Sequence, residues 1–569
     1  MTDYRPFVAI SRHWPNLLRG RTELTVMDFT GRALEHLLAW TRAARTTLDP
    51  AVGLHLYWFC QHGELPEPPA MFGDDWFEDL PGVHRAQSRA DAVTLTVVIG
   101  KRSASSIEAD IESLAADMMV KADLALVRDL GQPVDAFVCH GALVVEPQRM
   151  QVRVAVQVRS AEVDERSKGW LSSEASPRTS LPGARRVLVV GAGIAGMTLA
   201  AVLCDHGFEV TVLDSRAPLG NDGVHQGHLA AALTPVVSAD DNIRSRLSRA
   251  GALMADRLWK GLPQPVGWRC GALQLQRPVS AKRQADLEQV ATGLGLPEWA
   301  QWVDAGQASA LAGQSLSRGG LWLPGGWVVR VPDLLQTLGQ RQGLTLLKAH
   351  VHHLTRQAGL WCVVDENGDV IERAPVAVLA NAADALGMLL RSGLNMAAYH
   401  EDVGVKRLLS MHRLAGEITL IPAADLDQGP RCIVGGDGYV LPAVDGWCVS
   451  GGTYVRDVAG ADMFAQVSEV GRVQNVQRVA SLLDRPNLTD KIKEVGQLPG
   501  WAGWRAVVSG RLPVVGLVPT QADLYLCTAG ASRGLTWASL QAHLIADHLL
   551  CRGPALERSL LASIAPQRE

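Results

Sequence analysis

The clearest pattern of apolar and polar positions runs from Val187 to Asp214 and reads VLVVGAGIAGMTLAAVLCDHGFEVTVLD. The apolar residues at its start predict a buried strand, the segment after the glycines predicts a helix, and Val210 to Leu213 predict a second strand. A strand, a glycine turn, a helix and a second strand in this order are typical of a dinucleotide-binding unit.

The chain before this unit alternates between strand and helix patterns, which indicates a further α/β domain built on a parallel sheet. About a third of the chain lies in this region. The patterns predict a strand and an amphipathic helix within Glu23–Trp40, strands at Val52–Phe59, Thr94–Ile99 and Val134–Cys139, and helix over Ile107–Leu130.

A polar stretch rich in Ser, Pro, Arg and Glu separates the two regions, and it has no apolar periodicity, which predicts a linker. Beyond it, strand patterns and tryptophans dominate Pro265–Trp327 and Leu408–Tyr454, which predicts a largely antiparallel substrate domain inserted twice into the nucleotide-binding fold. We therefore expect a domain over 1–158, a linker over 159–185 and a second domain over 186–569. Within the second domain, the nucleotide-binding parts are expected at about 186–262, 328–400 and 500–569. The parts of the substrate domain are expected at about 263–327 and 401–499.

Composition narrows the classes of function. A chain of 569 residues is too long to fold around a single hydrophobic core. A content of 47% hydrophobic and 20% charged residues is typical of a globular protein. A net charge of -4 gives no global attraction to nucleic acid, so RNA would need a local basic patch. No apolar run approaches the roughly 20 residues that cross a bilayer, and the N-terminus lacks the apolar core of a signal peptide, so we expect a cytoplasmic protein. The nine scattered cysteines favour reduced thiols over disulfides or a zinc site.

Each of the three glycines in the motif has a separate predicted role. Gly191 permits the tight turn, Gly193 lets a pyrophosphate approach the backbone, and Gly196 lets the helix pack closely on the strand. Asp214 ends the second strand, where its carboxylate can accept hydrogen bonds from a ribose. We predict all four as cofactor-binding residues.

Three later segments are predicted to approach the same cofactor. A glycine-rich loop after Asp214 contains His225 and Gln226, and Val376–Ala380 predicts a second buried strand that passes the cofactor. The strand Leu524–Thr528 leads through AGASRGLT into a helix that ends near Leu550. Free N–H groups at that helix N-terminus can stabilise negative charge on a reduced flavin ring. The residues predicted to bind cofactor here are Gln226, Gly530, Ser532, Gly534 and Leu535.

From Val187 onward the chain resembles the FAD-dependent oxidoreductases of the D-amino-acid oxidase and glycine oxidase class. Within that class it is most similar to the oxidase half of the bifunctional tRNA 5-methylaminomethyl-2-thiouridine biosynthesis family (MnmC). The resemblance spans nearly the whole second half in the family's order. Its segments include GAGIAG (191–196), HQG (225–227), CGALQL (270–275), LANAADA (379–385), GGTYVRD (451–457), WAGWR (501–505), RLPVVG (511–516) and SRGLTWA (532–538).

The resemblance implies FAD as cofactor and oxidation of a carbon beside a secondary amine. In the tRNA-modifying relatives the substrate is 5-carboxymethylaminomethyl-uridine at the wobble position, and cleavage leaves an aminomethyl group and glyoxylate. A substrate carboxylate needs a cationic partner, for which a guanidinium fork is suited. Arg505 matches the carboxylate-binding arginine of the amino-acid oxidases, and Arg511 and Arg533 are the next candidates. The alternative for each arginine is a surface ion pair.

The N-terminal third is similar to the methyltransferase half of the same family, through LPGVHR at 80–85 and VDAF at 134–137. It departs from that pattern at the loop that should approach S-adenosylmethionine, where Asp28–Leu34 holds a single glycine, Gly31. His140 also stands where the family has an acid. We therefore expect a degenerate methyltransferase-like domain that persists as a scaffold or an RNA-contact surface.

Three functions remain open at this point. The chain is an FAD oxidase of a modified wobble uridine in tRNA, an FAD oxidase of free glycine, sarcosine or a similar small amine, or a flavin-binding protein without turnover. No metal site is predicted, because the histidines of KAHVHHL (348–354), which reads as an exposed strand, lack an acidic or cysteine partner at suitable spacing. The electron acceptor and the oligomeric state stay open.

Overall fold

The computed structural model describes residues 23–49, 52–72, 76–88, 93–100, 111, 114–115, 118, 122–126, 138–146, 151–154, 185–216, 219, 225–277, 286–394, 403–456, 465–492, 494–550 and 552–567. The chain forms two compact units. The first contains Met1–Ser180 and Asp547–Ala562, and the second contains Leu181–Ala546 and Ser563–Glu569. The predicted linker lies outside the described residues except for Arg185.

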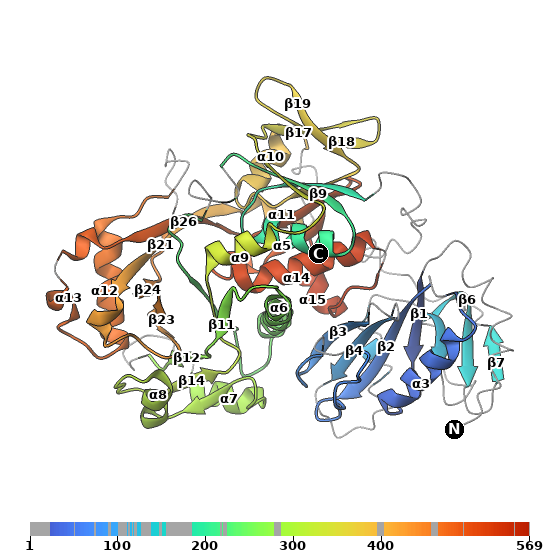
Figure 1. Ribbon diagram of the computed structural model, residues 1–569, viewed down its shortest axis with the longest axis horizontal. Coiled ribbons are helices and arrows are strands. Elements are labelled where there is room, and N and C mark those ends of the chain that lie inside the picture. The colour runs from blue at the N-terminus through green and yellow to red at the C-terminus, as the bar shows by residue number, and fades with distance from the viewer. Residues whose placement is uncertain are drawn as a thin grey trace. The chain divides into compact units, whose positions relative to one another are not determined.

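The first unit is built on a seven-stranded sheet in the order β3-β4-β2-β1-β5-β6-β7. The five inner strands run parallel, while β3 and β7 pair antiparallel at the two edges (blue to cyan in Figure 1). The parallel α/β prediction is therefore confirmed. The bounds are β1 (Glu23–Asp28), α3 (Leu34–Arg45), β2 (Gly53–Gln61), β3 (Gly82–Ser88), β4 (Val93–Gly100), β5 (Ala122–Leu126), β6 (Val138–Glu146) and β7 (Gln151–Val154).

The helix predicted over Ile107–Leu130 is wrong in part, because Ala122–Leu126 is the strand β5. This strand pairs with both β1 and β6, so it lies inside the sheet. A short apolar run reads equally well as a buried strand or a buried helix, and only its sheet partners decide between the two.

One polar cluster lies inside the first unit. Arg85 of β3 donates from Nη1 to the carboxylate of Asp547 and from Nη2 to the carbonyl oxygen of Gly553 at 2.5 Å. The Asp547 carboxylate also accepts from the backbone N–H of Ala555 at 3.2 Å. The Arg85 and Asp547 side chains are only 11% and 6% exposed. The sheet of the first unit therefore depends on a segment that the sequence places at the far end of the chain.

The nucleotide-binding part of the second unit contains a six-stranded sheet in the order β16-β9-β8-β20-β28-β27, parallel except for β27. Its strands are β8 (Arg186–Val190), β9 (Glu209–Asp214), β16 (Leu344–Lys348), β20 (Val376–Leu379), β27 (Val514–Leu517) and β28 (Leu524–Thr528). This part of the second unit also contains the helices α5 (Ile194–Asp205), α6 (Ile243–Lys260), α9 (Val331–Leu338), α10 (Asp384–Arg391), α11 (Val403–Leu409) and α14 (Gly534–Leu549), except for the last three residues of α14. Most of α15 (Arg558–Ile564) belongs to the first unit.

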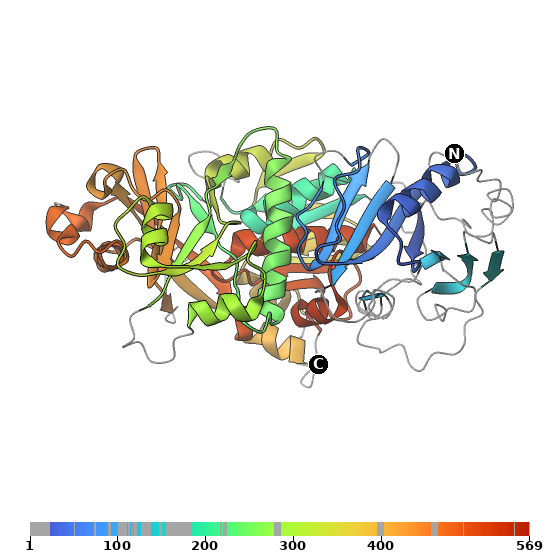
Figure 2. The same cartoon turned by 90° about the horizontal axis from the view of Figure 1, so that it is seen from below.

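Helix α6 crosses α14 at close range, as Figure 2 shows with α6 in green and α14 in red. A Cβ added to Gly251 of α6 would lie 2.4 Å from the carbonyl oxygen of Thr536 in α14. Glycine at this position therefore lets the two helix backbones approach, which brings α6 to the first turn of α14.

The antiparallel architecture predicted for the substrate domain is observed as a nine-stranded sheet in which, among the described strands, only β12 and β22 pair in parallel, while its substrate role stays a prediction. Its path is β13-β14-β12-β22-β23-β24-β21-β25, and β26 pairs with β21. The strands are β12 (Ala272–Leu275), β13 (Gln301–Val303), β14 (Gly320–Leu323), β21 (His412–Pro422), β22 (Ile433–Gly436), β23 (Gly438–Val444), β24 (Trp447–Gly451), β25 (Val455–Arg456) and β26 (Gly500–Val507).

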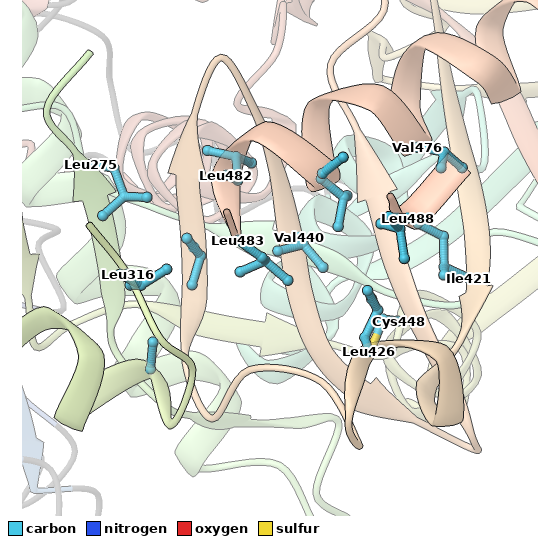
Figure 3. Close-up of a cluster of buried hydrophobic side chains, with 14 of the residues drawn as sticks. Leu275, Leu316, Ile421, Leu426, Val440, Cys448, Val476, Leu482, Leu483 and Leu488 are labelled. Atoms are coloured by element: carbon cyan, nitrogen blue, oxygen red, sulfur yellow. The ribbon is translucent and has the colours of Figure 1, made fainter. Parts of the chain in front are cut away.

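Helix α12 (Glu469–Leu482) packs against β21, β23 and β24 (Figure 1). Figure 3 shows the apolar side chains that fill the space between helix and sheet, among them Val440, Cys448 and Val476. Residues 278–285 and 457–464 of this region are outside the described part. Short helices complete it: α7 (Leu287–Leu294), α8 (Ala305–Ala312), α13 (Leu488–Lys491), η5 (Ala423–Leu426), η6 (Val495–Gln497) and η7 (Ser509–Arg511).

Two sequence-based boundaries need correction. The nucleotide-binding part expected from residue 500 begins later, because Gly500–Val507 is β26 and pairs with β21 along eight residues. The segment 348–354 is not one strand, since β16 ends at Lys348 and the next strand starts at His353. Two small sheets also occur: β10 (Ala231–Leu233) with β11 (Gly267–Arg269) and β15 (Trp327–Val329), and β17 (His353–Gln357) with β18 (Leu360–Val364) and β19 (Val370–Ala374).

Within the described part of the chain, no helix combines the length and the apolar character needed to cross a membrane.

The Arg85–Asp547 pair yields a stability prediction. Asp547→Ala leaves the Arg85 charge buried and unpaired, which should lower the unfolding free energy of the first unit by about 3 to 5 kcal/mol in chemical denaturation. Glu35→Ala is the matched control, because Glu35 is an exposed carboxylate of α3 in the same unit and its loss should cost about 1 kcal/mol or less. Equal effects of the two substitutions would contradict the prediction.

Candidate functional site

The glycine turn between β8 and α5 gives each glycine a distinct environment. Gly191 has φ +110°, and a Cβ there would lie 2.6 Å from the carbonyl oxygen of Ala380. A Cβ on Gly196 would lie 1.9 Å from the Gly191 oxygen. Around Gly193, by contrast, the nearest described atom to such a Cβ is His225 Nε2, at 4.0 Å. Two glycines therefore serve packing, while Gly193 leaves room for a ligand to reach the backbone.

Asp214 holds this turn in place from the end of β9. Its carboxylate accepts a hydrogen bond from the backbone N–H of Ala192 at 2.8 Å and another from that of Arg216 at 3.0 Å. An ionised carboxylate has about four acceptor positions, so both bonds leave capacity for a ribose hydroxyl. The ribose contact stays a prediction, and the structure adds a positioning role for the turn.

Three strand ends converge beside the glycine turn. Strands β8, β20 and β28 are parallel neighbours, and Leu379 of β20 is in register with Val190 on one side and Leu526 on the other. The Thr528 hydroxyl donates to the carbonyl oxygen of Ala382 at 2.7 Å, which joins the turns that follow β20 and β28. Ligands of open α/β sheets bind outside the carboxyl ends of the strands, so this edge is the candidate cofactor site.

The turn between β28 and α14 has an uncommon backbone. Ala529 and Ala531 have φ values of 59° and 47°, a left-handed conformation that costs on the order of 1 kcal/mol or more for a residue with a Cβ. A Cβ on Gly534 would meet nothing within 4 Å among the described atoms, so the start of α14 is open. Ser532 is exposed and Leu535 is buried. Cofactor binding by Gly530, Ser532, Gly534 and Leu535 stays a prediction.

One face of β26 presents Trp501 and Arg505. Residues 501, 503 and 505 alternate along the strand and share this face. The Trp501 ring lies over Gly503, where a Cβ would be 2.2 Å from it, and the Arg505 guanidinium lies over Gly416 of β21, where a Cβ would be 2.0 Å away. Glycines at these two paired positions therefore let a tryptophan and an arginine lie flat on the sheet.

The opposite face of the same strands is covered by α12. Glu417 accepts from the backbone N–H and the hydroxyl of Ser468, the N-cap of α12, both at 2.9 Å. Because successive strand residues point to opposite faces, Gly416 and Arg505 face away from α12. We call this the β26 face, defined by Gly416, Trp501, Gly503 and Arg505.

Arg505 is available for a substrate anion. Its Nη1 donates to the carbonyl oxygen of Thr453 at 3.2 Å, and its guanidinium lies 5.0 Å from the ring centroid of Tyr454. Among the described residues no carboxylate forms an ion pair with it. The phenol pKa of the neighbouring, half-buried Tyr439 is raised by desolvation, with Arg505 acting in the opposite direction. The Arg505 guanidinium and the phenol groups of Tyr439 and Tyr454 therefore lie close together.

The other two arginines are placed differently. Arg533 donates from Nη1 to the carbonyl oxygen of Thr234, and burial lowers its pKa. Arg511 is exposed, at the end of η7 and with φ 55°. Both stay predictions as substrate-binding residues, but of the three only Arg505 lies on the β26 face.

The β26 face is joined directly to the cofactor edge. The backbone N–H of Ala531 donates to the carbonyl oxygen of Ala506 at 3.0 Å, so the turn before α14 is bonded to the residue that follows Arg505. This single bond places the substrate-anion candidate next to the open start of α14.

A second connection runs through two histidines. The His228 ring stacks on Trp501 with centroids 4.1 Å apart and an interplanar angle of 9°, and His228 Nδ1 lies 3.1 Å from His225 Nδ1. Burial, with the charge of Arg216, lowers the pKa of His225 to about 4. Burial, His225 and Arg505 hold the pKa of His228 well below its usual range. Both rings are therefore neutral at physiological pH.

Sequence reasoning missed several members of this site. Gly416, Tyr439, Tyr454, His228 and Trp501 received no role, although GGTYVRD, which contains Tyr454, and WAGWR, which contains Trp501, were singled out. An isolated glycine in the strand pattern RLAGEITLI was the available signal for a close approach at Gly416. Gln226, which was assigned to the cofactor, is exposed, and its role stays a prediction. Among the described residues no group of His, Cys, Asp and Glu is arranged to hold a metal ion.

Comparison with protein families gives one match over most of the second unit. The family described as FAD dependent oxidoreductase matches residues 186–548, which is more than half of the chain. The matched range includes both the glycine turn and the β26 face.

Curated relatives extend the similarity into the N-terminal unit. The tRNA 5-methylaminomethyl-2-thiouridine biosynthesis bifunctional protein MnmC of Cupriavidus metallidurans is 31% identical and aligns with 89% of this chain and 80% of its own length. The protein of the same name from Thiobacillus denitrificans is 30% identical over 90% of this chain and 82% of its own length.

Solved structures share the fold of the second unit. Glycine oxidase from Geobacillus kaustophilus aligns with a TM-score of 0.53 at 20% identity, over 68% of this chain and 99% of its own. L-alpha-glycerophosphate oxidase from Mycoplasma pneumoniae with FAD bound aligns with a TM-score of 0.52 at 15% identity, over 64% of this chain and 94% of its own. At these identities the likeness concerns the fold alone.

The open space at Gly193 yields a binding prediction. Gly193→Val places a branched side chain where the diphosphate of FAD approaches the backbone, so the purified protein should lose its flavin absorbance. Gly261→Val is the control, because Gly261, the C-cap of α6, has φ -80° and an added Cβ there would lie 3.5 Å from the nearest atom, an ordinary contact. Full flavin content in Gly193→Val would reject the assignment of this turn.

Proposed function

This chain belongs to the FAD-dependent oxidoreductase family and to the MnmC proteins, and from that membership we propose a substrate. The chain uses FAD and acts on CH–NH groups. The proposed substrate is tRNA that carries a 5-carboxymethylaminomethyl group on its wobble uridine. The proposed reaction removes the carboxymethyl group and leaves an aminomethyl group on the base.

The residues of the second unit fit FAD. Gly193 offers open space at the N-terminus of α5, where backbone N–H groups favour a diphosphate. Asp214 retains acceptor capacity for a ribose, and the open start of α14 at Gly534 favours negative charge near a flavin ring. These positions meet at the carboxyl edge of one parallel sheet.

Arg505 is the residue proposed to bind the substrate carboxylate. A guanidinium can hold a carboxylate through two parallel N–H···O bonds, and Arg505 has no competing carboxylate among the described residues. The hydrogen bond from Ala531 to Ala506 places it beside the cofactor edge. A carboxymethyl group held at Arg505 would therefore present its methylene carbon toward that edge.

The chemistry follows from this placement. FAD, when bound, accepts a hydride from the carbon beside the amine. Loss of that hydride and of the N–H proton turns the substrate C–N bond into an imine, and water then adds to the carbon and releases glyoxylate and the aminomethyl product. The chain's own contribution is orientation by Arg505 and removal of water by apolar and aromatic neighbours such as Trp501.

One observation carries the proposal: Arg505, which has no ion-pair partner among the described residues, lies next to the cofactor edge of a chain that aligns with MnmC proteins over about nine tenths of its length. The test is direct. Purified holoprotein is given tRNA with the carboxymethylaminomethyl group, or free glycine and sarcosine at equal concentration, and glyoxylate and nucleosides are measured by mass spectrometry. Turnover of tRNA supports the proposal. Turnover of the free amines alone, or of neither substrate, would reject it.

Arg505→Lys should separate substrate binding from cofactor binding. Lysine keeps the charge but cannot form the bidentate contact, so kcat/KM should fall by about fiftyfold, which corresponds to roughly 2 to 3 kcal/mol. Flavin absorbance should remain, since Arg505 lies on the substrate sheet. Arg373→Lys, at an exposed arginine of β19 to which no role is assigned, is the matched control and should leave the rate unchanged. A normal rate in Arg505→Lys would move the carboxylate role to Arg533 or Arg511.

We further propose that the first unit does not methylate. After β1 the Asp28 carboxylate accepts from the backbone N–H of Thr30 at 2.8 Å, and both residues are buried, as is Phe29. Gly31 has φ 63° and is the sole glycine of this loop. The Phe29 side chain stacks on Phe59 inside the core, so the loop is closed by its own packing. The side chain of His140, which lies in β6, is not described.

The expected product therefore stops at the aminomethyl nucleoside, even when S-adenosylmethionine is present. Mass spectrometry of nucleosides from tRNA treated with the full-length protein measures this directly, and titration calorimetry of the same protein with S-adenosylmethionine should show no binding heat. The full chain is needed because Asp547–Ala562 belongs to the first unit. A methylaminomethyl product would refute the proposal.

A further inference from the structure

His225 and His228 form a pair that the proposed reaction does not use. Their Nδ1 atoms lie 3.1 Å apart, a distance at which one nitrogen donates and the other accepts. His228 is fixed against Trp501 by the parallel stack, and His225 also lies near Trp501, with ring centroids 5.5 Å apart. The two histidines belong to the loop that follows β9, and their rings pack against Trp501 of the β26 face.

The other nitrogen of His225 lies toward the glycine turn. His225 Nε2 is 4.0 Å from a carbon placed at the Cβ position of Gly193, and apart from the adjoining residues of the turn no other described atom lies within that distance. A ligand group that approaches the Gly193 backbone therefore comes within reach of this nitrogen. In the dinucleotide fold that group is the diphosphate.

Two arrangements of protons are possible in a neutral pair. If His225 Nδ1 donates to His228, its Nε2 is an acceptor and would repel a phosphate oxygen. If His228 Nδ1 donates to His225, the His225 proton resides on Nε2, which then donates toward Gly193. An anion over Gly193 selects the second arrangement, because only that one supplies a hydrogen bond to negative charge.

We infer that His225 binds the diphosphate of FAD through Nε2–H, and that His228, held by its stack on Trp501, sets the tautomer that makes this bond available. The groups around His225 are consistent with an anion site: Arg216 and the N-terminus of α5 supply positive potential, and the described neighbours include no carboxylate that acts on either ring. This inference rests on the cofactor alone, so it stands or fails independently of the proposed tRNA substrate.

The test measures FAD affinity, with activity left aside. Full-length apoprotein is titrated with FAD, and Kd is obtained from quenching of flavin fluorescence. His225→Ala should raise Kd about tenfold or more, the loss expected for a hydrogen bond to a charged acceptor. His225→Gln keeps an N–H donor at similar reach and should recover most of the affinity. His350→Ala, at an exposed histidine after β16, should leave Kd unchanged.

A spectroscopic readout separates a direct contact from a merely structural role. The two ³¹P resonances of bound FAD should shift between wild type and His225→Ala, and His225→Gln should shift them less. His228→Ala should weaken binding as well, because it removes the partner that sets the tautomer. An unchanged Kd in His225→Ala, or equal losses in His225→Ala and His225→Gln with unshifted ³¹P resonances, would overturn the inference.

Discussion

Helix α5 starts in contact with the turn that precedes it, because a Cβ on Gly196 would lie 1.9 Å from the carbonyl oxygen of Gly191. That contact fixes where the helix N-terminus points. The Asp214 carboxylate then bonds the turn to the end of β9, and Ala380 closes it from the side of β20. The cofactor edge of the second unit therefore depends on a backbone approach that only glycine permits.

The substrate sheet is aligned with that edge by a small number of contacts between distant parts of the chain. The backbone bond from Ala531 to Ala506 joins the turn before α14 to β26, and the stack of His228 on Trp501 joins the loop after β9 to the same strand. Both contacts end within a few residues of Arg505. Arg505 is thereby positioned beside the candidate cofactor edge.

The first unit combines a mainly parallel sheet with a closed loop after its first strand. Five parallel strands persist, and buried Phe29 and the Asp28–Thr30 hydrogen bond close the loop after β1. The buried pair of Arg85 and Asp547 makes the C-terminal segment part of this unit. Such a pair gains little in net stability but is costly to break, so it retains the segment whether or not the domain binds a ligand.

The sequence by itself determined the glycine turn and the acid at the end of β9, because those roles depend on backbone geometry within one βαβ unit. It also determined the mainly parallel character of the seven-stranded sheet and the mainly antiparallel character of the nine-stranded sheet, since apolar periodicity follows from local burial. It did not determine that Ala122–Leu126 is a strand or that Gly500–Val507 belongs to the substrate sheet. Those outcomes, and the choice of Arg505 over Arg511 and Arg533 as the arginine on the β26 face, were decided by tertiary structure, because they depend on pairing between segments whose separation in sequence carries no local signal.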